Sequence, residues 1–93
     1  MKREEILSKA EDIVNGARQN TYGSPEDCFA SIAGMWGSYL GISLSPSDVA
    51  MLMVLLKVAR TKGRRDSADN YIDIAGYAAC AGELTNATDC KGG

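Results

Sequence analysis

The sequence predicts an all-α protein, and two observations support this. Apolar residues recur with the 3.6-residue period of a helix, and no segment shows the strict alternation of a β-strand. Two serine–proline pairs, Ser24-Pro25 and Ser45-Pro46, are helix starts, because serine caps a helix and proline fits its first position. We expect one four-helix bundle-like domain over residues 1–85 and a flexible tail over residues 86–93.

The first two helices are separated by a polar break. The first is expected over about residues 3–18, and the second runs from Ser24-Pro25 to a stop at Gly41. Gly34 and Gly37 lie inside the second helix, where each destabilises an isolated helix by up to ~1 kcal/mol relative to alanine. Close approach of another backbone would offset that cost.

The third and fourth helices follow a second capping signal. The third starts at Ser45-Pro46 and is apolar on all sides up to Lys57, so we expect it to be the central helix, covered by its own chain or by a second copy. Gly63 ends this segment, residues 66–69 supply the next N-cap, and the fourth helix runs to about Glu83 or Leu84. A chain of 93 residues buries little core, so we expect homo-oligomerisation to complete the fold.

Composition narrows the class of partner. The net charge is -2, and no field of one sign points to duplex DNA, duplex RNA or a membrane surface. The longest apolar run, residues 49–56, is far shorter than the ~20 residues that span a bilayer. The N-terminus is charged rather than apolar, so a secretory signal is not expected. We therefore expect a cytoplasmic protein.

The inventory of reactive residues is small. The chain has 3 cysteines without a paired spacing and no histidine, which argues against a disulfide framework, a zinc site and a histidine general base. It also lacks the glycine-rich phosphate loops and the H-E-x-x-H motif. No cofactor is expected on these grounds.

Two carboxylates, Asp69 and Asp73, stand one turn apart at the head of the fourth helix. Asp73 begins an almost wholly apolar stretch, where an unpaired charge would be destabilising by several kcal/mol. It therefore needs a cation such as Lys57 or Arg60, or a metal ion. Either these acids are a dipole contact and an internal ion pair, or they line a ligand pocket, directly or through Mg²⁺.

A cluster of cations ends the third helix. Five of the chain's 10 lysines and arginines lie within residues 57–65. Lys57 and Arg60 flank Val58 and Ala59, where the apolar pattern of the third helix still continues. The preference for cations in the last turn of a helix, where they interact with its dipole, explains part of this cluster. Cations within an apolar segment, however, usually have a fixed anionic partner, here either Asp73 or a phosphate. Arg18, beside Tyr22, is a further candidate phosphate ligand.

Three stretches, "RQNTYGSPEDCFASIAGMW", "DVAMLMVLLKVAR" and "DNYIDIAGYAA", resemble a family of small phage and prophage proteins that is distantly similar to the MazG-type all-α nucleotide pyrophosphohydrolases. The resemblance covers residues 5–83. MazG-type enzymes hold Mg²⁺ with an E-E-x-x-E group and an E-x-x-D pair. Asn70 and Asp73 stand at the second pair, whereas Lys57 and Arg60 stand where the first group's acids would be expected.

This departure moves the expected partner from Mg²⁺ to the phosphate itself. The resemblance then implies a phage protein that sequesters a nucleotide immune signal, cyclic or of the ADP-ribose type, without cleaving it, and so counteracts bacterial defence. The expected ligand-binding residues are Arg18, Lys57 and Arg60 for phosphate, Asp69, Asn70 and Asp73 for ribose or base, and Tyr22 or Tyr77 for stacking.

Two alternatives remain open. The first is a Mg²⁺-dependent nucleoside triphosphate pyrophosphohydrolase that uses Asp69 and Asp73, with Glu26 or Asp27, to hold the metal. The second is a non-catalytic helical interaction module, in which Asp73 only pairs with a neighbouring cation.

Overall fold

The computed structural model describes residues 1–15 and 25–88, and the side chains within them except those of residues 25–27 and 86–88. Four helices and no strand lie in these ranges, so the predicted all-α class is confirmed. The helices are α1 (Arg3–Asn15), α3 (Pro25–Leu40), α4 (Pro46–Thr61) and α5 (Ala68–Thr88).

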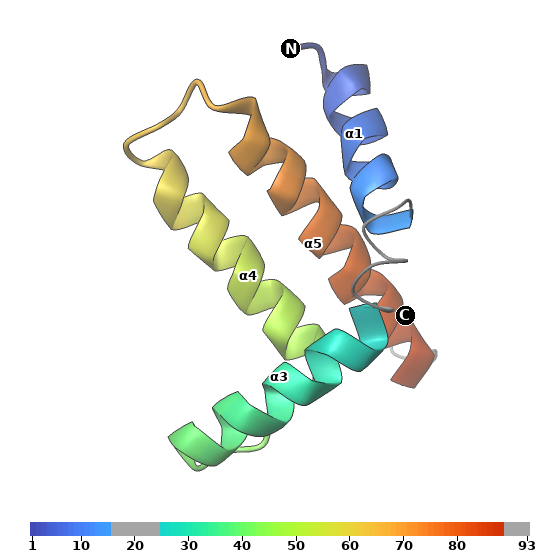
Figure 1. Cartoon of the computed structure of the whole chain (residues 1–93), viewed down its shortest axis with the longest axis vertical. Helices are drawn as coiled ribbons and strands as arrows, with labels where there is room; N and C mark the ends of the chain where they lie inside the picture. Colours follow the sequence, from blue (N-terminus) through green and yellow to red (C-terminus); the bar gives the residue numbers. More distant parts are fainter. Residues whose placement is uncertain (16–24, 89–93) are drawn as a thin grey trace.

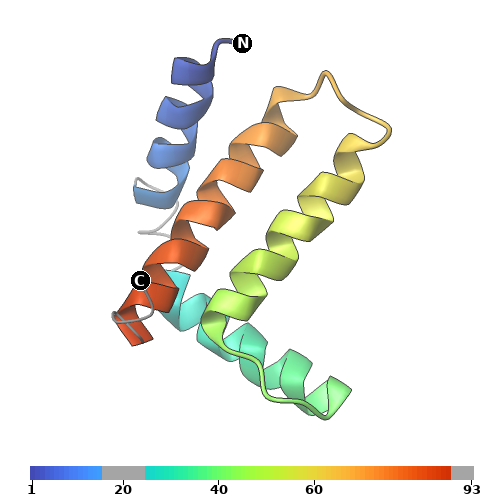
Figure 2. The ribbon, with the colours of Figure 1, turned by 180° about the vertical axis from the view of Figure 1, so that it is seen from behind.

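The central helix is α5, which packs against α4 on one side and α1 on the other, while α3 lies across the end of the α4–α5 pair (Figure 1). Our expectation that the third helix, α4, would be central is therefore wrong. The reason is side-chain size: α5 carries glycine and alanine through its middle, and Gly76 lets Val14 of α1 approach within 3.2 Å of the position its Cβ would occupy. Helices α1, α5 and α4 lie side by side, and α3 crosses the end of the α4–α5 pair (Figure 2).

The second serine–proline signal starts α4 as expected. The Ser45 hydroxyl accepts a hydrogen bond from the Asp48 N–H at 3.0 Å, and the Asp48 carboxylate accepts one from the Ser45 N–H at 2.9 Å. This reciprocal capping box satisfies two backbone donors that the helix itself cannot use, with Pro46 at the first position. Replacing such a cap with alanine typically costs about 1 kcal/mol.

Helix α3 ends at a glycine that the backbone requires. Gly41 has a φ of 74°, and the N–H groups of Gly41 and Ile42 both donate to the Gly37 carbonyl. The turn folds back so closely that a Cβ on Gly37 would lie 2.7 Å from the Ile42 carbonyl oxygen. The expected close backbone approach is thus confirmed at Gly37, whereas Gly34 faces open space.

The core is small and joins α3, α4 and α5. Val49 is fully buried at 0% exposure, and it lies in one cluster with Phe29, Ala33, Ala50, Cys80, Ala81 and Leu84. Four of these seven side chains are alanine or cysteine, so the helices approach closely but bury little apolar area. A core of this size leaves many larger apolar side chains outside it.

Two helix ends differ from the sequence expectation. Helix α1 is described to Asn15, so the expected end near residue 18 lies outside the described residues. Helix α5 continues to Thr88, which makes residues 86–88 helical rather than part of the tail. The segment from Glu83 to Thr88 contains neither glycine nor proline, so nothing in it stops the helix.

Candidate anion-binding site

An ion pair links α4 and α5 near the connection between them. The Lys57 Nζ lies 2.9 Å from the Asp73 carboxylate, and the two side chains are 20% and 25% exposed. The predicted pairing of Asp73 with a cation of the preceding helix is therefore confirmed. Because both groups are largely screened from water, the pair is stronger than an ordinary surface ion pair.

The other four cations of the cluster at residues 57–65 follow Lys57 closely along the chain. Arg60, Lys62, Arg64 and Arg65 are all exposed, and no second ion pair lies within 4.0 Å among the side chains of residues 1–15 and 28–85. Because Asp73 is already bound to Lys57, it does not neutralise the other cations. The C-terminal end of α4 and the connection after it therefore carry a positive surface that can accept an anion.

The connection itself is held in place by hydrogen bonds. The Arg64 N–H donates to the Thr61 carbonyl at 3.1 Å, and the Ser67 N–H donates to the Arg64 carbonyl at 3.1 Å. The hydroxyl of Tyr71 donates to the Arg65 carbonyl at 2.9 Å and so ties α5 to the loop. Sequence reasoning missed this role of Tyr71, although a tyrosine in the first turn after a polar loop is a usable signal.

The other predicted site residues on α5 lie at different depths. Asp69 is exposed at the rim of the cluster, and Asn70 is buried at 7% exposure, one turn before Asp73. Tyr77 packs its ring on Phe29, with centroids 6.1 Å apart and a 41° tilt, so this ring is part of the core edge. Its predicted stacking on a ligand stays a prediction.

Arg18 and Tyr22, which we also predicted to bind the ligand, lie outside the described residues. The structure therefore brings together Lys57 and Asp73 and places Arg60, Asp69 and Asn70 at the same end of the α4–α5 pair. It does not test how the first loop contributes.

The acids do not assemble into a metal site in the described part of the chain. No group of three or more cysteine, aspartate or glutamate side chains there is placed to hold an ion. The Asp73 carboxylate is engaged by Lys57 at 2.9 Å, which leaves Asp69 as a lone exposed carboxylate on this end of α5. The side chains of Glu26 and Asp27 lie outside what is described.

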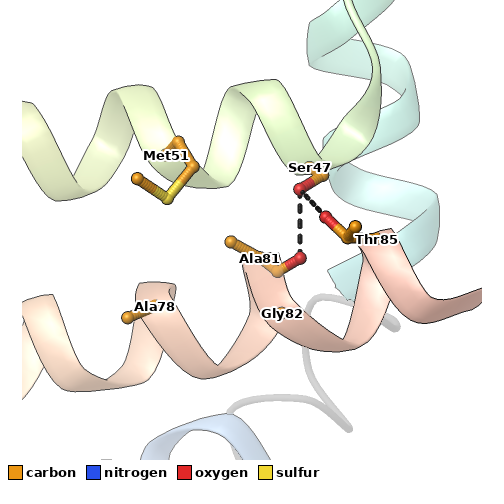
Figure 3. A pocket seen from close by; sticks show the side chains of 6 residues that line it. All are labelled: Ser47, Met51, Ala78, Ala81, Gly82 and Thr85. Atoms are coloured by element: carbon orange, nitrogen blue, oxygen red, sulfur yellow. Dashed lines mark hydrogen bonds between the residues drawn. The ribbon is translucent and has the colours of Figure 1, made fainter. Parts of the chain in front are cut away.

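A shallow depression of about 370 Å³ lies at the opposite end of the α4–α5 pair (Figure 3). The Ser47 hydroxyl donates to the Ala81 carbonyl at 3.0 Å and lies 2.6 Å from the Thr85 hydroxyl. Met51, Ala78 and Gly82 complete the lining, which carries no charged side chain. These contacts fix the register of α4 on α5, and the depression offers nothing that would hold a phosphate.

None of the helices in the described ranges is both long and apolar enough to cross a membrane. This agrees with the short apolar run in the sequence.

Comparison with known proteins places the chain among phage proteins. The Gene 55 protein of Mycobacterium phage D29 is 43% identical over 77 residues, which are 83% of this chain and 51% of that protein. The Gene 55 protein of Mycobacterium phage L5 is 45% identical over 74 residues, 78% of this chain and 47% of that protein. The chain thus spans about half the length of the curated relatives it matches.

No solved structure matches the chain. One family model covers nearly all of it, residues 5–85, which include all four described helices almost entirely and the whole cation cluster. The chain belongs to the family described as Domain of unknown function (DUF6378).

Proposed function

We propose that the protein binds a nucleotide through its phosphates at the basic end of the α4–α5 pair, and holds it without cleaving it. The observation that supports this most directly is the division of charge there. Asp73 is committed to Lys57 at 2.9 Å, while Arg60, Arg64 and Arg65 are exposed on the same end. The arginine fork matches the geometry of a phosphate group, so these side chains suit a phosphate ligand.

Sequestration fits this end of the molecule better than hydrolysis. Cleavage of a nucleoside triphosphate by a MazG-type route needs carboxylates that hold Mg²⁺ and activate water. In the described part of the chain the acids of the α4–α5 end do not converge, and one of the two is occupied by Lys57. We propose a MazG-like scaffold that has retained nucleotide binding and that carries cations in place of the metal-binding acids.

The biological role we propose follows from the relatives, which are phage proteins. A phage protein that captures a cyclic or ADP-ribose-type nucleotide would lower the free concentration of an immune signal in the infected cell. Such a role needs a protein that is abundant and binds tightly, and it needs no turnover. Asp69, exposed beside the cations, would then contact ribose or base, whereas Asn70 is buried at 7% exposure.

Self-association is part of this proposal. On a single chain the cations are open to water, where a phosphate contact is weakened by solvent and salt. A second copy that covers this end would exclude water and strengthen each contact. We therefore propose a homo-oligomer as the binding form.

The test is a thermal-shift panel of cyclic dinucleotides, cyclic ADP-ribose forms and nucleoside triphosphates, in EDTA. We expect one class to raise the midpoint of unfolding without divalent metal, because binding to the native state alone stabilises it. Arg60→Gln should reduce that shift at least several-fold. Lys9→Gln, at an exposed lysine in the middle of α1, which packs on α5, is the control and should leave the shift unchanged.

Recovery of the ligand decides between binding and cleavage. Mass spectrometry of the nucleotide released by heating should show the intact compound after overnight incubation with the protein. Release of pyrophosphate that appears with Mg²⁺ and disappears with EDTA would instead support the pyrophosphohydrolase.

A second candidate function is favoured by a separate observation. Many large apolar side chains of α3 and α4 are exposed, which is typical of a helical interaction module. If no nucleotide shifts the unfolding midpoint and Asp73→Asn lowers only stability, this reading replaces the nucleotide binder.

A further inference from the structure

The outward side of α4 is apolar although it faces solvent. Leu52, Leu55, Leu56 and Val58 are 39%, 59%, 47% and 48% exposed. Met51, at 47%, lies at the edge of this side, where it also borders the depression between α4 and α5 (Figure 3). A surface helix that packs on one side ordinarily has polar residues on the other. Between Asp48 near the start of α4 and Lys62 just after its end, this outward side carries only apolar residues, including the exposed Ala59.

The second half of α3 extends this surface. Met35, Trp36, Tyr39 and Leu40 are 64%, 37%, 89% and 57% exposed. Figure 1 shows this half of α3 running away from α5, beyond the lower end of α4, so that the two helices diverge from the point where they meet. The exposed apolar side chains therefore belong to two helices that meet at the start of α4 and that both lie on the other side of α5 from α1, or beyond its end (Figure 1).

The area is that of an interface rather than of an ordinary surface. Exposed apolar patches on monomers rarely exceed about 300–600 Å². A large apolar side chain offers on the order of 200 Å², so the nine exposed side chains of α3 and α4 named above together present roughly the 800 Å² per partner of a stable complex. A surface of this size destabilises a free monomer in water and is stabilised by a partner.

We propose that this surface binds a second copy of the same chain, with the two α4 helices antiparallel about a two-fold axis at Leu55. The spacing of the exposed residues supports this occupant. Positions 48, 52, 55, 58 and 62 follow one another at steps of four, three, three and four, so they share one side of the helix and read the same in both directions. A seam on one helix that matches its own reverse is what an isologous interface requires.

The register about Leu55 makes each contact complementary. Leu55 meets Leu55 of the partner subunit on the axis, and Leu52 meets Val58 of the partner subunit. Next to this pair, Met51 meets Ala59 of the partner subunit, the smallest side chain on the outward side of α4. Large side chains thus oppose small ones, as close packing of two helices requires.

Opposite charges face each other at both ends of this interface. The same register places Asp48 opposite Lys62 of the partner subunit, and by symmetry the reverse pair forms at the other end. One oxygen of Asp48 accepts from the Ser45 N–H, which leaves the second oxygen for the cation. A parallel arrangement would instead set Asp48 against Asp48 and Lys62 against Lys62, which is repulsive.

The interface also bears on the ligand site, and this step rests on the proposed function. In the antiparallel pair, the start of α4 of one copy lies beside the end of α4 of the other. The second half of the partner's α3 then extends over the cation cluster of the first copy. Tyr39 of the partner subunit, 89% exposed in the single chain, is the side chain we expect to stack on the nucleotide base.

The first experiment measures mass in solution by light scattering and native mass spectrometry. The protein should be an even-numbered oligomer at micromolar concentration, and Leu55→Asp should halve its mass. Leu7→Asp is the matched control, because Leu7 of α1 is 62% exposed and lies on the opposite side of α5. A monomeric parent protein, or an oligomer that keeps its mass in Leu55→Asp, would overturn the proposal.

A second variant keeps the proposal testable if Leu55→Asp does not fold. Leu55→Cys, in a background with Cys28→Ser and Cys90→Ser, places one thiol on the two-fold axis. With oxidised glutathione as the oxidant, we expect a disulfide-linked dimer, while Leu7→Cys in the same background should stay a single chain. The absence of a covalent dimer in Leu55→Cys would contradict the two-fold register.

The two proposals fail in different ways. An oligomer that Leu55→Asp dissociates, but that no nucleotide stabilises, would refute the nucleotide binder and leave the interface standing. A parent monomer that binds nucleotide would refute the interface and the oligomeric binding form, and would leave nucleotide binding itself standing. If both hold, Tyr39→Ala should weaken the nucleotide shift in the thermal panel without changing the oligomeric mass.

Discussion

The inward and outward sides of α4 differ although the sequence makes both apolar. The inward side packs Val49 at 0% exposure and is tied to α5 by two polar contacts, Ser47 to Ala81 and Lys57 to Asp73. The outward side has apolar contacts available and no such tie. Directional contacts fix the register of α4 on α5 within the chain, whereas the outward side is free to bind after the chain has folded.

Two contacts on the inward side run in opposite order along the two helices, which makes α4 and α5 antiparallel neighbours. Ser47 at the start of α4 reaches Ala81 late in α5, and Lys57 near the end of α4 reaches Asp73 early in α5. Both ends of the pair are therefore fixed. Substitutions on the two sides of α4 should consequently affect different measurements.

The largest expected effect comes from Val49→Ala. Removing two methyl groups at 0% exposure leaves a cavity, so we expect the free energy of unfolding to fall by about 2–3 kcal/mol. Urea denaturation at several protein concentrations measures this, and the loss should be the same at each. Leu55→Ala, on the outward side, should lose stability only at concentrations where the oligomer is populated.

If Leu55→Ala lowered the free energy of unfolding equally at all protein concentrations, the inward and outward sides of α4 would not differ in this way. That result would mean that Leu55 is buried within its own chain, contrary to its 59% exposure.

The next effect is that of Asp73→Asn, which removes one partner of the ion pair and leaves Lys57 at 20% exposure. We expect a loss of about 1–2 kcal/mol, between the values for a surface pair and for a buried pair. Asp69→Asn, at the exposed aspartate one turn earlier, should change stability by less than about 0.5 kcal/mol. Both are measured by urea denaturation at low and high salt.

Salt provides the check on the cause. If the loss in Asp73→Asn arises from the ion pair, the difference from the parent protein should shrink as salt screens it. A loss of the same size at both salt concentrations would assign it to packing or hydrogen bonding instead.

The smallest effect is expected for Ser47→Ala at the other end of the inward side. It removes the hydrogen bond to the Ala81 carbonyl at 3.0 Å, so we expect a loss of about 1 kcal/mol. Ser43→Ala, at an exposed serine in the preceding loop, is the control and should be neutral within about 0.5 kcal/mol. Equal effects in the two variants would show that the Ser47 contact does not hold α4 in register.

Most helix ends were predictable because their signals are local. The serine at position 45 and the glycine at position 41 act through hydrogen bonds within a few residues, and both have the expected geometry. The end of α5 was less predictable, because no residue there stops a helix before Gly92. Local signals determine where a helix starts more sharply than where it frays.

The candidate site was predictable in part. The rule that a carboxylate inside an apolar helix needs a cation identified Asp73 and its partner Lys57, and their atoms lie 2.9 Å apart. The tie from Tyr71 to the Arg65 carbonyl was not predicted, because it depends on the path of the loop. The place of Tyr77 against Phe29 likewise depends on where α3 crosses.

The sequence by itself determined the helical class, the caps at Ser45 and Gly41, and the need of Asp73 for a cation, because these follow from period, backbone chemistry and the cost of an unpaired charge. Only the tertiary structure decided which helix is central and which side of α4 stays exposed. The reason is packing: an all-round apolar helix can bury any side, and the small residues of α5 give it two neighbours. That choice leaves the outward side of α4 exposed.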